Sequence, residues 1–184
     1  ALLPVARAAA VRARLLLAAL LVAALPAAAA PCTGTVYLTL DTGHMEPAEA
    51  IADILDRHGV KATFFLSNQE TKRGVGALDP AFAPYWKRLV AAGHAFGSHT
   101  WRHWPFAGDT AAGKVRYAKP GTTQGEVLDA PALCAELKKP EEAFRAMTGR
   151  GFDGLWRAPG GKTSPKALEY AKGCGFTHAG WSPA

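Results

Sequence analysis

The chain has 184 residues, of which 49% are hydrophobic and 20% are charged. This length and balance are typical of one globular domain with a substantial core, and they leave too little chain for two full domains. The formal net charge of +6 includes three arginines within the first thirty residues, and it falls to +3 without them. This small excess of positive charge gives no reason to expect a nucleic-acid partner.

The first thirty residues have the layout of a secretory signal peptide. Arg7, Arg12 and Arg14 precede an apolar run from Leu15 to Leu25, and Pro26 and small residues follow. A run of this length is shorter than the roughly 20 residues that a membrane-spanning helix needs. We therefore predict a signal peptide at residues 1–30, no stable membrane span, and export to the periplasm or the extracellular space, with a retained anchor as the alternative.

From residue 35 onward, short β-branched or aromatic runs alternate with longer amphipathic stretches. This alternation is typical of β/α units around a largely parallel sheet. The predicted strands are residues 35–40, 61–66, 94–99, 154–157 and 176–181, and the predicted helices are 47–58, 80–92, 131–147 and 164–174. Residues 104–129 are rich in Gly, Lys, Thr and Pro, and they predict a long loop or insertion.

The three cysteines are Cys32, Cys134 and Cys174, and no two of them form a C-x-x-C pattern. A cysteine-bound zinc is therefore not expected. In an oxidising compartment one pair can form a disulfide. The spacing does not decide which pair it is, and Cys32, close to the predicted mature start, is expected to be the unpaired one.

Charged side chains follow the predicted strands at Asp41, His99 and Arg157. In β/α architectures this edge of the sheet is where active sites assemble. The segment 98–103 reads SHTWRH and places His99 and His103 four residues apart, which on a helical turn is one face. Two neutral imidazoles placed in this way can bind one divalent ion. The alternative is a pair of surface histidines.

Two further segments have the same form. The segment 37–44 reads YLTLDTGH and ends a strand in an acid, which either serves chemistry or caps the following turn. The segment 156–161 reads WRAPGG and delivers Arg157 into a Pro/Gly turn. On its own, Arg157 could be a surface cation.

Together, TLDTG, HTWRH and RAP follow the order of the motifs T-F-D-D-G, H-[ST]-x-x-H and R-x-P. From about residue 35 to its last residue, the chain resembles the polysaccharide deacetylases of carbohydrate esterase family four, with their NodB-homology domain. The resemblance implies an α/β fold of the distorted (β/α) barrel type. It implies hydrolysis of N- or O-acetyl groups on a carbohydrate such as peptidoglycan or a chitin-like oligomer. Residues 31–184 would be this domain, and we expect it to be truncated at the C-terminus, because the family's late L-x-H histidine is missing and His178 lies on the wrong element to replace it.

The resemblance also assigns roles to residues. His99 and His103 become ligands of a divalent metal ion, with zinc expected, and Asp41 becomes the general base. Arg157 would keep Asp41 charged and oriented. Three further residues would contact substrate: Pro159 and Gly160, whose turn would stabilise an oxyanion through the Gly160 N–H, and Trp181, whose ring would stack on a sugar. For Trp181, core packing is the alternative.

One position departs from the family pattern. Thr42 stands where the first motif has its second aspartate, and a neutral hydroxyl is a poor substitute for a carboxylate ligand. The third ligand is then Thr42 itself, a residue from elsewhere such as His44, or water. The remaining alternative is a protein that has lost its metal and its activity. A noncatalytic carbohydrate-binding protein on the same scaffold is therefore the competing function.

Overall fold

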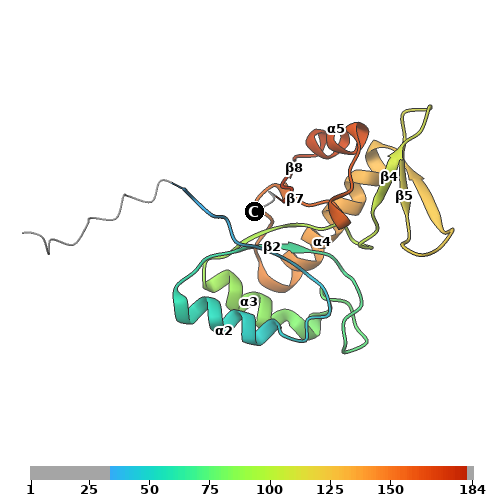
Figure 1. Cartoon of the computed structure of the whole chain (residues 1–184). Helices are drawn as coiled ribbons and strands as arrows, with labels where there is room; N and C mark the ends of the chain where they lie inside the picture. The colour runs from blue at the N-terminus through green and yellow to red at the C-terminus, as the bar shows by residue number, and fades with distance from the viewer. Residues whose placement is uncertain (1–33, 182–184) are drawn as a thin grey trace, which may run out of the picture. The chain divides into compact units, whose positions relative to one another are not determined.

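Five parallel strands form the central sheet in the order β1-β2-β3-β7-β8 (Figure 1). The structure is a computed structural model that describes residues 34–181, so the predicted signal peptide at 1–30 and Cys32 lie outside the described residues. The chain divides after Val36, and the fold below is that of the unit beginning at Tyr37. In this described part β1 and β8 are the two edges of the sheet. The predicted α/β class is confirmed.

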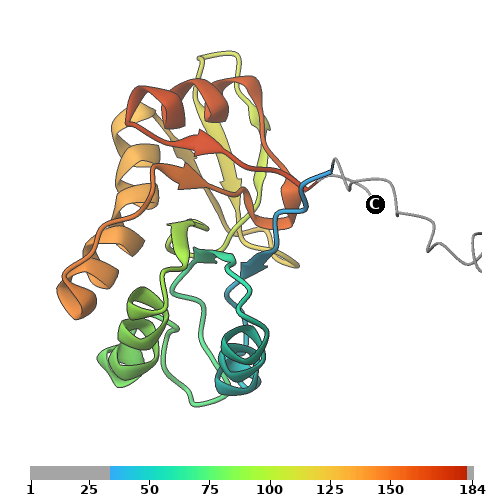
Figure 2. The ribbon, with the colours of Figure 1, turned by 90° about the vertical axis from the view of Figure 1, so that its left-hand side faces the viewer.

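The strands alternate with helices along the chain, as the sequence pattern predicts. The strands of the sheet are β1 (Thr39–Asp41), β2 (Thr63–Leu66), β3 (Ala95–Ser98), β7 (Leu155–Trp156) and β8 (Thr177–His178). The helices are α2 (Ala48–His58), α3 (Ala83–Ala91), α4 (Ala130–Thr148) and α5 (Pro165–Gly173), with short 3-10 turns η1 (Pro80–Phe82) and η2 (Pro159–Gly161). Helix α4 packs against both α3 and α5 (Figure 2).

Local signals in the sequence set the ends of the longest helix. Asp129 caps the start of α4 by accepting a hydrogen bond from the Ala132 N–H at 3.0 Å. Gly149 ends it in the left-handed conformation at φ 78°, which costs a glycine little. These two signals explain why the helix predicted at 131–147 agrees with the structure to within one residue at each end.

Apolar side chains form two clusters of buried residues. The first joins the sheet to α2, α3 and part of α4, and its large members include Phe64, Trp86, Leu89, Phe96 and Phe144. The second lies around β7 and β8, and its members include Phe106, Tyr117, Leu133, Leu137, Trp156 and Phe176. Both clusters hold the strands from which the charged residues emerge.

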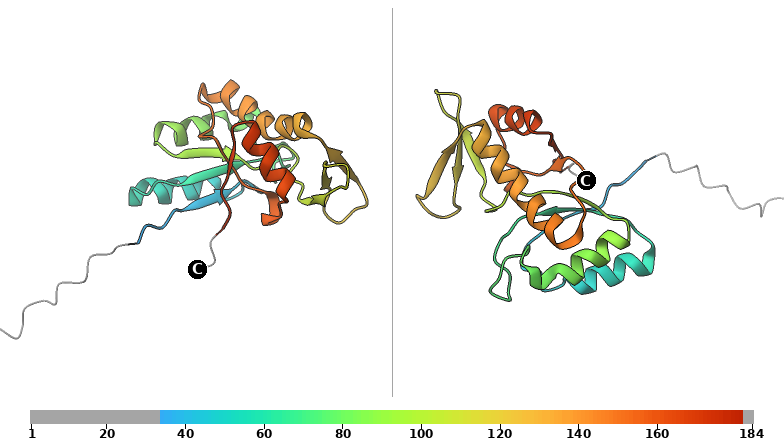
Figure 3. Two further views of the ribbon diagram at one scale, coloured as in Figure 1. Left: turned by 90° about the horizontal axis from the view of Figure 1, so that it is seen from above. Right: turned by 180° about the vertical axis from the view of Figure 1, so that it is seen from behind.

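The prediction of a loop at residues 104–129 is wrong. These residues form a second, antiparallel sheet of β4 (Phe106–Asp109), β5 (Val115–Ala118) and β6 (Gly125–Leu128) (Figure 3). Each strand has only four residues, and each gains its stability from its neighbours in the hairpins rather than from a local pattern. Among these strands, only β5 has the alternation of buried and exposed residues that is typical of a strand, with Val115 and Tyr117 both fully buried.

All five strands of the central sheet are shorter than predicted, and β1 and β8 lose the most residues. β1 begins at Thr39 instead of residue 35, because its single neighbour β2 begins at Thr63, which pairs with Thr39. β8 pairs only with β7, which has two residues, so its regular part is limited to Thr177–His178. In both cases the length of the partner strand sets the boundary.

A disulfide joins Cys134 on α4 to Cys174 after α5, with Cα atoms 5.9 Å apart. This is the pair that remains if Cys32 is the odd cysteine. The bond fixes two helices that flank β7. Among residues 34–181, no helix is long and apolar enough to cross a membrane.

Candidate active site

The carboxyl edge of the sheet brings together Asp41, His99 and Arg157. Asp41 is the last residue of β1, His99 follows β3 and Arg157 follows β7. The ladder continues past the strands, because the His99 N–H donates to the Leu66 carbonyl and the Arg157 N–H donates to the Ser98 carbonyl, both at 2.8 Å. Backbone hydrogen bonds therefore fix the positions of the residues from which the His99 and Arg157 side chains project.

Arg157 is a buried cation, and each of its three guanidinium nitrogens donates a hydrogen bond. Its side chain is 2% exposed, and Nη1 donates to Asp41 Oδ1 at 3.0 Å. Nε donates to the Ala179 carbonyl at 2.9 Å, and Nη2 donates to the Gly180 carbonyl at 3.4 Å. The planar guanidinium is thus anchored by the segment after β8, and it holds one oxygen of Asp41 in place. The other oxygen of Asp41, Oδ2, does not bond to Arg157 and lies near His99.

Two aromatic rings lie close to this guanidinium. The Arg157 carbon Cζ lies 4.3 Å from the centre of the Phe65 ring and 5.2 Å from that of Trp181. A side chain at Gly161 would overlap the Trp181 ring. Trp181 is nevertheless 52% exposed. It therefore packs on the site and still offers surface to a ligand.

The two histidines meet through their Nε2 atoms, which are 3.2 Å apart. His99 Nε2 lies 3.6 Å from Asp41 Oδ2, and His99 Nδ1 lies 2.8 Å from the Arg157 carbonyl oxygen. A carbonyl can only accept, so His99 Nδ1 carries the proton and Nε2 keeps its lone pair. This is the tautomer that a metal ligand needs.

Burial keeps both imidazoles neutral. It lowers the pKa of His99 to about 4, with the Asp41 carboxylate opposing the shift only in part. Burial also lowers the pKa of His103 from its ordinary value. At neutral pH, therefore, the two rings present nitrogen lone pairs rather than positive charges.

This donor set fits one divalent ion held by two histidines. The two Nε2 atoms are 3.2 Å apart, so His99 and His103 would be the residues that hold such an ion, and neutral imidazole nitrogens are donors that zinc accepts. The carboxylate of Asp41 faces the same point. Among residues 34–181, however, no group of three or more His, Cys, Asp and Glu side chains is arranged to hold an ion.

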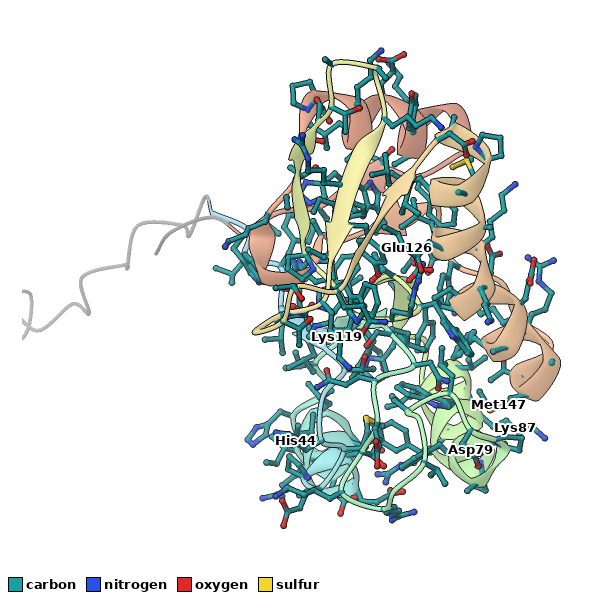
Figure 4. The ribbon with its side chains drawn as sticks, turned by 90° about the vertical axis from the view of Figure 1, so that its right-hand side faces the viewer. His44, Asp79, Lys87, Lys119, Glu126 and Met147 are labelled. Atoms are coloured by element: carbon teal, nitrogen blue, oxygen red, sulfur yellow. A yellow bond between two sulfur atoms is a disulfide. The ribbon has the colours of Figure 1, made fainter. Side chains whose placement is uncertain are left out.

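Neither of the two protein candidates for a third ligand faces the pair. The Thr42 hydroxyl is buried, accepts from the Ser67 N–H at 2.8 Å and shares a hydrogen bond with Ser67 Oγ at 3.0 Å. His44 is exposed on the loop beside α2 (Figure 4). A site completed by water is the alternative that this geometry favours.

The segment from His99 to His103 is a loop and contains no helical turn. Thr100 has φ 63° and His103 has φ 58°. Residues other than glycine rarely adopt this left-handed conformation, which costs of order 1–3 kcal/mol each. The imidazoles meet because the chain doubles back, and surrounding contacts must hold it there. Glu136 and Tyr117 supply them, and the motifs indicated neither residue.

The remaining predicted site residues lie directly after Arg157. Pro159 is buried and Gly160 is exposed at φ 62° within η2. His178 is not placed as an acid, because its Nε2 accepts a hydrogen bond from the Ala158 N–H at 3.2 Å. The exposed backbone of this turn is therefore the part of the segment that a ligand can reach.

A cavity of about 220 Å³ borders Asp41 and is lined by residues of β1, β2, α2 and α3 and of the loop before α2. Its lining is mostly apolar and includes Leu40, Met45, Ile51, Phe64 and Trp86. Neither His99 nor His103 lines it. The cavity and the histidine pair therefore share Asp41 but are otherwise lined by different residues.

The histidine pair predicts an acid-labile fold. In the metal-free protein the pKa of His99 is about 4, below its ordinary 6.5, so folding favours the neutral ring. The resulting stability is fully present above pH 6.5 and is lost as the pH falls towards 4. We expect this group alone to lower the free energy of unfolding by about 3 kcal/mol. Urea unfolding between pH 7 and 4 should be less pH-dependent in His99→Gln, and parallel curves would contradict the assignment.

A family model described as Polysaccharide deacetylase matches residues 28–179. The chain belongs to the polysaccharide deacetylase family. The match covers most of the chain, and it confirms the resemblance carried by the three motifs.

Named relatives share part of the sequence. The chitooligosaccharide deacetylase of Azorhizobium caulinodans is 26% identical over 149 residues, covering 80% of this chain and 58% of that protein. A chitin deacetylase of Pestalotiopsis sp is 29% identical over 147 residues, covering 79% and 41%. The chain spans about half the length of the curated relatives it matches.

A solved structure shows the same fold. A family 4 carbohydrate esterase pseudoenzyme from Bacillus anthracis superposes with a TM-score of 0.58 at 21% identity, covering 83% of this chain and 44% of that one. The α/β fold of the deacetylase type is thereby confirmed, and in the described residues its sheet is open between β1 and β8. Since that protein is a pseudoenzyme, the fold alone does not decide activity.

Proposed function

We propose that the protein is a metal-dependent hydrolase that removes acetyl groups from the sugars of an extracytoplasmic polysaccharide. The observation that carries this proposal is Asp41, held by Arg157 at 3.0 Å and facing His99 Nε2 at 3.6 Å. A fixed carboxylate beside a pair of neutral imidazoles is what metal-assisted hydrolysis requires. The chitin and chitooligosaccharide deacetylases among the relatives support the substrate class.

His99 and His103 would hold the divalent ion, with zinc expected from nitrogen donors at this separation. When bound, such an ion supplies a Lewis acid that makes a water acidic near neutral pH and polarises the acetyl carbonyl. The chain's own contribution is the neutral tautomer of His99, fixed through Nδ1 by the Arg157 carbonyl.

Asp41 would act as the general base. Arg157 occupies Oδ1, so Oδ2 is the oxygen that would take the proton from the attacking water. The Gly160 N–H in the turn after Pro159 would donate to the oxyanion that develops on the acetyl group. Because that turn follows Arg157 directly, one segment would orient the base and stabilise the charge on the substrate.

The sugar would bind over Trp181 and the turn at Pro159 and Gly160. Trp181 is half exposed and already packed on Arg157, so its ring would offer a rigid apolar face to a pyranose. The substrate would be an acetylated polymer of the chitin or peptidoglycan type. No contact of this surface favours nucleic acid.

Two observations support export. The layout of residues 1–30 is that of a signal peptide, and Cys134 and Cys174 form a disulfide, a bond that persists in oxidising compartments. Both suit the periplasm or the extracellular space, where the proposed polysaccharide lies.

A noncatalytic carbohydrate-binding protein is the second candidate. Thr42 favours it, since this residue cannot replace a carboxylate ligand and is already bonded to Ser67. Such a protein would keep the exposed ring of Trp181 for sugar binding but would release no acetate.

Zinc binding and acetate release distinguish the two candidates. We expect the full chain to bind one zinc ion, and to release acetate from an N-acetylglucosamine oligomer until a chelator is added. His99→Ala should weaken zinc binding at least about 100-fold, whereas His58→Ala, an exposed histidine at the end of α2, should leave it unchanged. Oligomer binding that resists the chelator, with no acetate released, would favour the binding protein.

A further inference from the structure

The loop that carries both histidines is held in a conformation that its own residues do not favour. The left-handed φ of Thr100 and His103 places unfavourable backbone at two of five positions. Such strain persists only where surrounding structure over-determines it. The contacts that hold this loop therefore decide whether the two Nε2 atoms stay 3.2 Å apart.

Several of these contacts converge on one residue, Glu136. Glu136 projects from α4 and is 7% exposed. Its Oε1 accepts the Arg102 N–H at 2.8 Å, its Oε2 accepts Arg102 Nε at 3.2 Å, and its backbone carbonyl accepts the Trp101 N–H at 3.1 Å. One residue of α4 thus fixes the two residues between Thr100 and His103.

A second path runs from Glu136 through Tyr117 on β5. The Tyr117 hydroxyl lies 2.7 Å from Glu136 Oε1 and 3.0 Å from Thr100 Oγ1. A phenol has one proton, and the carboxylate can only accept, so Tyr117 donates to Glu136 and the Thr100 hydroxyl donates to Tyr117. Thr100 Oγ1 in turn accepts the His103 N–H at 3.2 Å. The path ends on the backbone of a histidine.

Positive charge balances the buried carboxylate. The Arg102 guanidinium lies 3.2 Å from Glu136 Oε2 and also pairs with Glu126 of β6. Its carbon Cζ lies 4.8 Å from the centre of the Trp104 ring and 5.1 Å from that of Tyr117. Glu136 is therefore paired and hydrogen-bonded, and the sheet of β4, β5 and β6 supplies part of its surroundings.

We propose that Glu136 is a positioning residue for the metal site, which acts by holding the loop 99–103 so that His99 and His103 converge on one ion. Glu136 contacts neither imidazole and would take no part in the chemistry. The inference rests on the proposed function, because it assumes that the two imidazoles bind an ion. It explains why a buried charge lies on the otherwise apolar face of α4.

Glu141 on the same helix provides a matched control. Its Oε1 accepts a loop N–H, that of Phe152 at 3.2 Å, and it also pairs with Arg145. Glu136 and Glu141 thus make the same kinds of contact from one helix, but only Glu136 reaches the histidine loop. Glu136→Gln keeps the volume and one acceptor, and it places an amide N–H₂ against the Arg102 guanidinium.

The test is cobalt(II) binding by the full chain, followed through its visible absorption, with amide hydrogen exchange measured on the same samples. We expect Glu136→Gln to raise the Kd for cobalt about 10- to 100-fold and to speed exchange at the His103 amide, while Glu141→Gln changes both less than about threefold. If Glu136→Gln fails to fold, Tyr117→Phe, which removes one hydroxyl, should raise the Kd about tenfold.

The outcomes separate the two ideas. Equal cobalt affinities in Glu136→Gln and Glu141→Gln, with a wild type that binds cobalt, would overturn the positioning role and leave the proposed function intact. A wild type that binds no cobalt would overturn the proposed function. That result would also overturn the role of Glu136 in a metal site, and exchange at the His103 amide would then show only whether Glu136 holds the loop: faster exchange in Glu136→Gln alone supports this hold, and equal exchange overturns it.

Discussion

Asp41→Asn is expected to reduce acetate release by about 10²- to 10⁴-fold, the range for the loss of a general base. Asparagine has nearly the same shape and can still accept from Arg157 Nη1, now 3.0 Å from Asp41 Oδ1. Its amide cannot take a proton from water. The effect should appear in kcat, because Asp41 would act on the attacking water rather than on the sugar. Initial rates on an N-acetylglucosamine oligomer at saturating zinc measure it.

Asp153→Asn is the control for this substitution. Asp153 also pairs with an arginine, Arg150 at 2.9 Å, and also accepts a backbone N–H, that of Phe96 at 2.8 Å. It lies before β7, at the opposite end of that strand from Arg157. Its replacement should change the rate less than about threefold. A rate in Asp41→Asn as high as in this control would show that another group is the base.

Metal affinity in Asp41→Asn addresses the missing third ligand. Asp41 Oδ2 is 3.6 Å from His99 Nε2, while the Thr42 hydroxyl is bonded to Ser67. If Asp41 acts as the base only, zinc binding in Asp41→Asn should stay within a few-fold of wild type. If zinc binding falls as far as in His99→Ala, Asp41 has taken the place of the absent carboxylate and cannot also be the base.

The parts of the fold that depend on local pattern could be predicted from the sequence. Helix α4 is an example, because Asp129 caps its start and Gly149 ends it. Both ends of the helix are therefore determined by residues next to them in the sequence. The same holds for the meeting of Asp41 with Arg157, 116 residues apart, because parallel strands place their carboxyl ends at one edge.

The parts of the fold that depend on residues distant in the sequence could not be predicted in this way. The sheet of β4, β5 and β6 consists of four-residue strands that are stable only as neighbours. The left-handed turns at Thr100 and His103 are held by Glu136 and Tyr117, so no rule applied to the segment HTWRH alone indicates them. One signal was available: Glu136 lies on the helix face of Leu133 and Leu137, where a charge calls for an explanation.

Removal of the disulfide is expected to be the largest single change in stability. Cys134 and Cys174 are 40 residues apart, and opening a loop of this length adds unfolded-state entropy worth about 4 kcal/mol at 25 °C. The double variant Cys134→Ser/Cys174→Ser should lose that much free energy of unfolding in urea at pH 7. Wild-type protein treated with a reductant should show the same loss.

The double serine variant is its own control, since a reductant should have no further effect on it. A loss below about 1 kcal/mol would mean that the packing of α4 on α5 suffices without the bond. A loss near the full value has a consequence for function. The closed loop contains β7 and Arg157, and its opening frees the segment that holds Asp41. A protein built in this way would reach full stability only where disulfides form, which is where the proposed polysaccharide lies.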